Sequence, residues 1–172
     1  YFGQLFGNAM VVQGGTIMAI GQASAFNGPG DSVVIPTGTS LSLRGDFTLE
    51  VLFRTSVGGV LMSKTPSDGN WKAGSKILFV RGGEVRFTSF EGGKDRNGGR
   101  LMNARVLVND GQWHHAVLTN RANVSGKRDR TILYVDGVER VRRADWDITS
   151  ADDSNLPLKL GVGAQAYPTT DV

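Results

Sequence analysis

Glycine turns divide this 172-residue chain into short segments in which apolar and polar residues alternate. A period of two places alternate side chains on one face of a β-strand, so Phe47, Leu49, Val51 and Phe53 are predicted to share one face of a strand. Glycine accounts for 24 residues, and each would cost roughly 1 kcal/mol in a helix interior. The pattern therefore argues against a helical bundle and predicts an all-β protein.

Two glycine turns predict β-hairpins. They are Gly82-Gly83, between segments 76–81 and 84–90, and Asp136-Gly137, between segments 131–135 and 138–142. Both dipeptides tolerate the positive φ that tight hairpin turns require. Further strands are expected at 11–12, 17–20, 24–26, 32–35, 60–63, 101–108, 113–119 and 158–162, and a polar loop at 91–99. About twelve antiparallel strands at this spacing predict a two-sheet sandwich or jelly roll.

The residue inventory excludes several kinds of site. The chain has no cysteine, which removes disulfides, cysteine nucleophiles and thiolate metal sites. Its two histidines, His114 and His115, are adjacent, and neighbours on a strand point to opposite faces. They are therefore predicted to be structural rather than joint ligands of one metal ion.

Catalysis is not expected from the acidic residues. Retaining glycosidases need two carboxylates about 5 Å apart. The four glutamates, Glu50, Glu84, Glu91 and Glu139, have no acidic partner at a suitable spacing, and Asp145 with Asp147 lack an adjacent acid–base glutamate. The sequence therefore predicts that the protein is not an enzyme.

Several motifs stand in an order typical of one family. Residues 21–28 read GQASAFNG and are followed by DSVVIP at 31–36, NDGQWHHAV at 109–117, LYVDG at 133–137 and LKLGVG at 158–163. Over about residues 21–163, this order resembles the laminin G-like domains of the concanavalin A-like lectin and glucanase superfamily. The resemblance implies an antiparallel two-sheet jelly-roll sandwich. We expect residues 1–172 to form one such domain, excised from a larger protein.

The family ends on a closing strand that the late part of this sequence lacks. Residues 1–5, YFGQL, resemble the start of such a strand. We expect the N-terminal segment to occupy that slot, or the closing strand to lie beyond Val172.

The charge is uneven along the chain. Residues 72–143 contain fifteen basic and seven acidic side chains, although the net charge of the chain is only +3. Most of the cations are arginines, whose planar guanidinium matches carboxylate, sulfate and phosphate groups. One interpretation is an anionic polymer as partner; the other is that the outward face of any sheet carries charge.

Sugar recognition uses aromatic rings together with hydrogen-bond donors and cations. Trp71, Trp146 and Tyr167 stand in polar, loop-like contexts, whereas Trp113 and Phe47 are assigned to the core. The candidate ligand-binding residues are Trp71, Arg86, Arg96, Arg100, Trp146 and Tyr167, with Arg105 beside them. The alternative is that Trp71 and Trp146 only cap the ends of the sandwich.

Calcium is a candidate cofactor because the family commonly binds it, through oxygen ligands. The oxygen-rich stretch consists of Asp145, Asp147, Asp152, Asp153 and Asn155. It lacks the spacing of an EF-hand, and no ligand can be carried over from the family. We therefore name no metal ligand and expect a solvated acidic loop.

The function expected from these observations is a non-catalytic, lectin-like carbohydrate-binding domain of a secreted or cell-surface protein that favours acidic glycans. The alternative is a protein–protein adhesion module, and a glycan hydrolase or lyase comes third. A polysaccharide or glycan is the expected partner, and a protein is the alternative. We expect neither nucleic-acid binding nor membrane insertion, since the apolar stretch 8–20 is interrupted at residues 13–16 and a membrane span needs about 20 residues.

Overall fold

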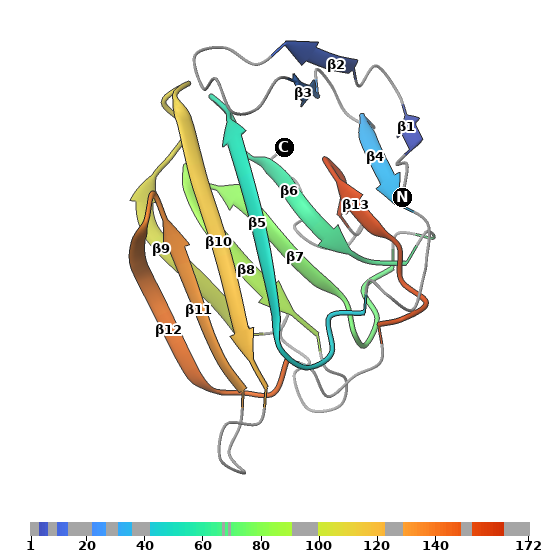
Figure 1. Ribbon diagram of the computed structural model, residues 1–172, viewed down its shortest axis with the longest axis vertical. Helices are drawn as coiled ribbons and strands as arrows, with labels where there is room; N and C mark the ends of the chain where they lie inside the picture. Colours follow the sequence, from blue (N-terminus) through green and yellow to red (C-terminus); the bar gives the residue numbers. More distant parts are fainter. Residues whose placement is uncertain are drawn as a thin grey trace.

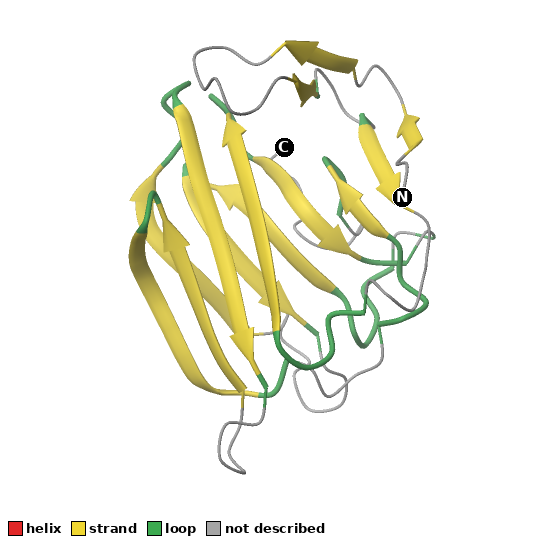
Figure 2. Ribbon diagram, in the orientation of Figure 1, coloured by secondary structure: helices red, strands yellow, loops and turns green. Residues whose placement is uncertain are grey.

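The computed structural model describes residues 4–6, 10–13, 22–26, 31–35, 42–66, 68, 70–90, 100–122, 129–148 and 153–163. Of residues 4–6, 10–13, 22–24, 100, 145 and 146, only the backbone is described. These parts of the chain form strands and turns (Figure 2). They contain no helix that is long and apolar enough to cross a membrane.

Two antiparallel sheets form layers that face each other (Figure 1). The larger sheet has the order β1 (Gln4–Phe6), β4 (Ser32–Ile35), β13 (Leu158–Leu160), β6 (Gly59–Lys64), β7 (Lys76–Arg81), β8 (Glu84–Ser89) and β9 (Arg100–Leu107). The smaller sheet has the order β12 (Val138–Trp146), β11 (Asp129–Val135), β10 (Trp113–Arg121) and β5 (Phe47–Arg54). A separate pair joins β2 (Met10–Gln13) to β3 (Gln22–Ala25). The predicted all-β, two-sheet sandwich is confirmed.

The core lies between the two sheets, where alternate residues of each strand meet. Leu78 and Phe87 of the larger sheet and Leu118 and Leu133 of the smaller sheet are completely buried. Burying such a side chain stabilises the fold by about 1.5–3 kcal/mol. Phe47 packs against this cluster, as predicted.

Both predicted hairpin turns have the expected backbone. Gly82 and Gly83 have φ of 60° and 76°, and Asp136 and Gly137 have φ of 54° and 75°. Positive φ at both central residues is the signature of a type I′ turn, whose twist matches that of the flanking strands. At Gly83 a Cβ would also lie 2.6 Å from Oδ1 of Asn109, so a side chain there would force Asn109 to move.

The predicted strand positions agree with the described strands, apart from two segments. Strands at 47–54, 76–81 and 32–35 have the predicted bounds, and the others differ by a few residues at their ends. The predicted strand 17–20 and the loop 91–99 lie outside the described residues. The N-terminal segment does supply a strand, since β1 pairs with β4 at one edge of the described larger sheet.

Trp113 corrects one assignment to the core. Ala116, Leu118 and Asn120 of β10 are buried, so the odd-numbered residues of this strand face away from the core. Trp113 is half-buried on that outer face, with the guanidinium of Arg54 at 5.6 Å from its ring centroid. The stacked arginine covers part of the indole in place of a core.

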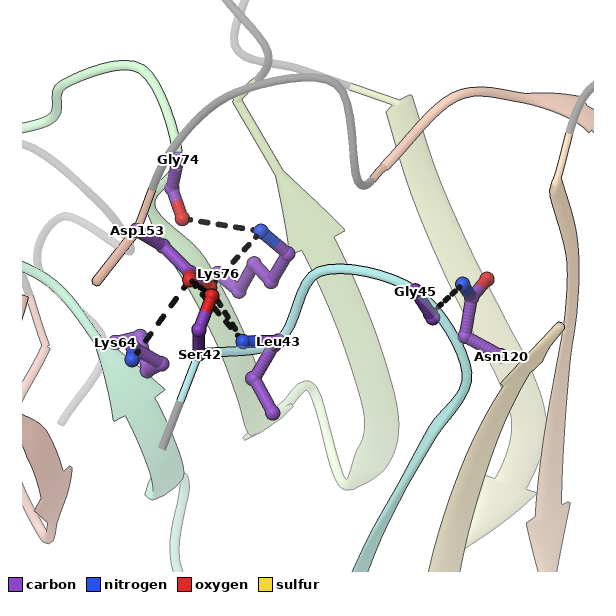
Figure 3. Close-up of polar contacts among 8 residues, drawn as sticks. All are labelled: Ser42, Leu43, Gly45, Lys64, Gly74, Lys76, Asn120 and Asp153. Carbon is purple, nitrogen blue, oxygen red and sulfur yellow. Dashed lines mark hydrogen bonds and ion pairs between the residues drawn. The ribbon is translucent and has the colours of Figure 1, made fainter. Parts of the chain in front are cut away.

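A buried carboxylate joins the segment before β5 and the segment before β13 to the larger sheet (Figure 3). Asp153 is fully buried, and its carboxylate accepts hydrogen bonds from the Ser42 hydroxyl at 2.8 Å and from the Leu43 amide at 3.1 Å. The ammonium groups of Lys76 and Lys64 lie 3.4 and 3.9 Å from its oxygens, and both lysines are 1% exposed. The predicted solvated acidic loop is therefore wrong at Asp153, because its charge balances two buried lysines.

Removing this carboxylate is expected to destabilise the whole fold. Asp153→Asn removes the carboxylate that lies between two buried ammonium groups, and breaking a buried ion pair costs about 3–5 kcal/mol. Chemical denaturation measures this loss of unfolding free energy. The control is Asp68→Asn, which removes a surface carboxylate paired with exposed Lys72. Equal effects of the two substitutions would contradict the role given to Asp153.

Candidate functional site

The outer face of the larger sheet carries the candidate binding residues whose side chains are described. Leu78, Val85 and Phe87 face the core, so the residues between them face the opposite way. Phe79 of β7 is paired with Arg86 of β8, and Arg86 is paired with Asn103 of β9. These three positions therefore form a row across three strands. We call Trp71, Phe79, Glu84, Arg86, Asn103 and Arg105 the outer patch.

A shared carboxylate holds the polar part of the outer patch. Oε2 of Glu84 accepts hydrogen bonds from Nδ2 of Asn103 at 2.7 Å and from Nη2 of Arg86 at 3.0 Å. The Asn103 and Arg86 hydrogen bonds, with the positive charge of Arg105 in addition, lower the pKa of Glu84. Glu84 is therefore ionised at neutral pH, and it orients Arg86 rather than supplying a proton.

A bulge in β9 brings Arg105 to this cluster. The register between β8 and β9 shifts between Glu84 and Arg86, and Arg105 has φ of 54°. Its amide donates a hydrogen bond to Oδ1 of Asn103 at 2.9 Å. Positive φ at a non-glycine residue stores backbone strain, and such strain clusters at binding sites. The bulge leaves Arg105 exposed next to Glu84.

Trp71 lies on the same face and covers β7. Its half-buried indole packs against Ile77 and Phe79, which are 1% and 0% exposed. The ring of Phe90 lies 6.2 Å away at 36°. Trp71 thus rests on the outer face of the larger sheet rather than at an end of the sandwich.

The side chains of the remaining candidates are not among those that the structure describes. Arg100 begins β9 opposite Ser89, and Trp146 ends β12 opposite Asp129 in the smaller sheet; neither side chain is described. Arg96 and Tyr167 lie outside the described residues. Sequence reasoning missed Asn103 and Glu84, since only the pairing of β8 with β9 shows that they meet.

The outer patch fits binding better than acid–base chemistry or metal coordination. It holds one carboxylate, Glu84, whereas glycoside hydrolysis uses a pair. Within the described part of the chain, no group of three or more His, Asp or Glu side chains is placed to hold a metal ion. Asp153, from the oxygen-rich stretch, is engaged by lysines. A tryptophan, two arginines and an amide are groups that recognise a sugar and its acidic substituents.

The adjacent histidines are both tied to carboxylates on opposite sides of the smaller sheet. Nδ1 of His114 lies 2.8 Å from Asp136, and Nε2 lies 3.1 Å from Asp110. His115 contacts Glu50 on the outer face at 2.8 Å. Burial would lower the pKa of His114, but the hydrogen bonds to Asp136 and Asp110 outweigh burial and raise it. His114 thus links the turns of Asp110 and Asp136 through its two ring nitrogens.

The His114 contacts predict how stability depends on pH. Because the pKa of His114 is raised on folding from its ordinary 6.5, its stabilisation is fully present below pH 6.5 and is lost as pH rises through the folded-state pKa. The unfolding free energy of the wild type should therefore fall from pH 6 to pH 9 more steeply than that of His114→Gln. Denaturant titrations across this range measure both slopes, and parallel slopes would contradict this role.

Comparison with known proteins identifies the family and shows which solved structures share the fold. Residues 27–170 match a laminin G family model described as the concanavalin A-like lectin/glucanases superfamily. No functionally curated protein matches the sequence. The binding domain of Paraclostridial Mosquitocidal Protein 1 superposes with a TM-score of 0.68 at 13% identity, over 95% of this chain and 40% of that one. The chain thus spans two fifths of that binding domain.

Two other solved structures with this fold differ in activity. The CBM40 of the Ruminococcus gnavus IT-sialidase, bound to α2,3-sialyllactose, has a TM-score of 0.50 at 14% identity, over 70% of this chain and 66% of that one. The endo-β-1,4-glucuronan lyase of the fungus Trichoderma reesei has a TM-score of 0.59 at 11% identity, over 96% and 80%. At these identities the similarity shows the fold alone, so function has to be argued from the site.

Proposed function

The chain belongs to the laminin G group of the concanavalin A-like lectin/glucanases superfamily, and on that premise we propose that it is a non-catalytic carbohydrate-binding domain whose outer patch contacts an acidic glycan. The observation that carries the proposal is the row of Arg86 and Asn103 across β8 and β9, with Trp71 over the buried Phe79 of β7 at one end and Arg105 at the other. We place the domain in a secreted or cell-surface protein, where polysaccharides are available.

The chemistry of the outer patch favours a sugar with a carboxylate or sulfate group. Nη2 of Arg86 donates a hydrogen bond to Glu84. Because a guanidinium has five N–H donors in a planar fork, this contact does not use all the donors of Arg86. Arg105 is exposed, so two guanidinium groups can bind anionic oxygens next to an aromatic surface. The patch carries the two positive charges of Arg86 and Arg105 and the single negative charge of Glu84. Its net positive charge favours an anionic ligand.

The structural neighbours are compatible with this ligand class. One of them is a carbohydrate-binding module with bound sialyllactose, an acidic sugar. Another acts on glucuronan, a polyuronate. The glucuronan lyase makes an enzyme the competing proposal. The single carboxylate of the outer patch, held ionised by Asn103 and Arg86, argues against that alternative.

The direct test is binding to immobilised glycans. We expect saturable binding to polygalacturonate or α2,3-sialyllactose and weaker binding to neutral dextran. Arg86→Gln with Arg105→Gln should weaken the acidic interaction by about tenfold or more, since a hydrogen bond to a charged group contributes about 1.5–3 kcal/mol. Repeating the assay with calcium and then with a chelator shows whether the ion takes part.

The matched control is Arg54→Gln with Arg140→Gln, which removes two charges from the smaller sheet. It should reduce affinity by less than twofold.

Trp71→Ala tests the aromatic contact, and the thermal unfolding of this variant has to be checked because Trp71 packs on Ile77 and Phe79. A folded wild type that binds no glycan would overturn the proposal and favour a protein partner. Depolymerisation of polyuronate by the wild type would make the domain a lyase.

A further inference from the structure

Two arginines face each other directly on the outer side of the smaller sheet. Arg121 of β10 is the register partner of Arg130 of β11. Asn120 and Thr131 beside them are buried toward the core, so both arginine side chains point away from it. Cβ atoms of directly opposite residues lie about 4.5–5.5 Å apart. Two guanidinium groups therefore project from adjacent points of one sheet face.

Arg121 and Arg130 have no acidic side chain in direct contact within the described structure. None of its acidic side chains forms a hydrogen bond or ion pair with Arg121 or Arg130. Asp46 lies next to this end of β10, where it accepts the Ala122 amide at 2.8 Å, and Asp129 precedes Arg130 but is buried toward the core. Glu139 binds Arg142 at 2.6 and 3.0 Å. Like charges directly opposite each other on neighbouring strands are destabilising. The pair thus carries an energetic cost that an anionic ligand would remove.

A third arginine lies beside the pair. Arg142 of β12 is the register partner of Ile132, which stands two residues from Arg130 on the same face of β11. Arg130 is half-buried, Arg121 is exposed and Ile132 is 9% exposed. Arg130 and Arg142 therefore flank Ile132 on this face, and the exposed Arg121 reaches water.

We propose that Arg121 and Arg130, with Arg142 beside them, form a second anion-binding surface that takes the sulfate or carboxylate groups of an acidic polysaccharide. This inference rests on the proposed function for the choice of polymer, but it concerns the opposite sheet and different residues. A polymer held by both sheets, or by two domains at once, gains avidity without any new contact.

The surroundings of the pair favour a polysaccharide over nucleic acid. Proteins that bind single strands stack bases on aromatic side chains, and the next residues of β10 and β11 on this face are Thr119 and Ile132, which are not aromatic. Reading a duplex requires an element that enters a groove, whereas these arginines stand within a broad sheet face. The planar forks of neighbouring arginines fit sulfate and carboxylate groups directly.

The test compares three double variants for binding to dextran sulfate and polygalacturonate, with uncharged dextran as the blank. Arg121→Gln with Arg130→Gln should weaken dextran sulfate binding at least fivefold and reduce its salt dependence. Arg54→Gln with Arg140→Gln, at the other end of the same sheet, should change binding less than twofold. The variant of the outer patch, Arg86→Gln with Arg105→Gln, reports on the proposed function separately.

Stability supplies a second readout. Because the neutral variant removes a repulsion, it should unfold at the same temperature as the wild type or a higher one. Arg121→Glu should raise the unfolding temperature further, through an ion pair with Arg130, and should bind dextran sulfate more weakly than the neutral variant does.

Each outcome of the binding assay has one meaning. Unchanged dextran sulfate and polygalacturonate binding by the Arg121 and Arg130 variant overturns the second surface, even if the outer patch variant loses affinity. Loss by the Arg121 and Arg130 variant alone supports the second surface and counts against the outer patch. Tighter binding to duplex DNA or poly(dT) than to dextran sulfate, lost in the same variant, would make this a nucleic-acid surface and overturn the proposal.

Discussion

The buried carboxylate of Asp153 holds together segments that are far apart in the sequence. It accepts hydrogen bonds from Ser42 and Leu43, which lead into β5, and it balances Lys64 at the end of β6 and Lys76 at the start of β7 (Figure 3). It thereby ties the approach to the smaller sheet to two central strands of the larger one. Lys76 also donates a hydrogen bond to the Gly74 carbonyl at 3.2 Å, which fixes the turn after Trp71.

That arrangement sets the position of the outer patch. Trp71 reaches the outer face of β7 because the segment before Lys76 folds back over the strand, where the Ser75 hydroxyl accepts the Lys72 amide at 3.1 Å. Glu84 and Asn103 then fix the guanidinium of Arg86 on the next strand. The aromatic and cationic groups are thus preorganised by the sheet itself, which limits the entropy that a bound sugar has to offset. The Arg121 and Arg130 pair, by contrast, lies on the other sheet.

Much of this fold could be predicted because its signals are local. The alternation at 47–54 and the glycine turns at 82–83 and 136–137 act over a few residues, and the strands and turns stand where those signals place them. The family motifs added the expectation of an antiparallel two-sheet jelly-roll sandwich. Trp113 was misplaced because both faces of β10 mix polar and apolar residues, so composition does not show which set is buried.

The interactions that make the candidate site are not local. Asp153 lies 77 residues from Lys76, and Glu84 lies 19 residues from Asn103. No periodicity links such residues, and pairing becomes visible only through strand register. The sequence names Trp71 and Arg86 as candidates, and their position on one face of the larger sheet, like the partners that orient Arg86, follows only from the strand register. The opposed arginines likewise depend on the register of β10 with β11.

The most direct measurement is an NMR titration of ¹⁵N-labelled protein with trigalacturonate, following the backbone amides and the tryptophan indole. The proposed function predicts saturable shifts centred on β7, β8 and β9, at Phe79, Arg86, Asn103 and Arg105, together with the Trp71 indole. Saturable shifts elsewhere that leave these strands unperturbed would show that the outer patch is not the glycan site. An unchanged spectrum at millimolar trigalacturonate would contradict the claim that this domain recognises acidic sugars.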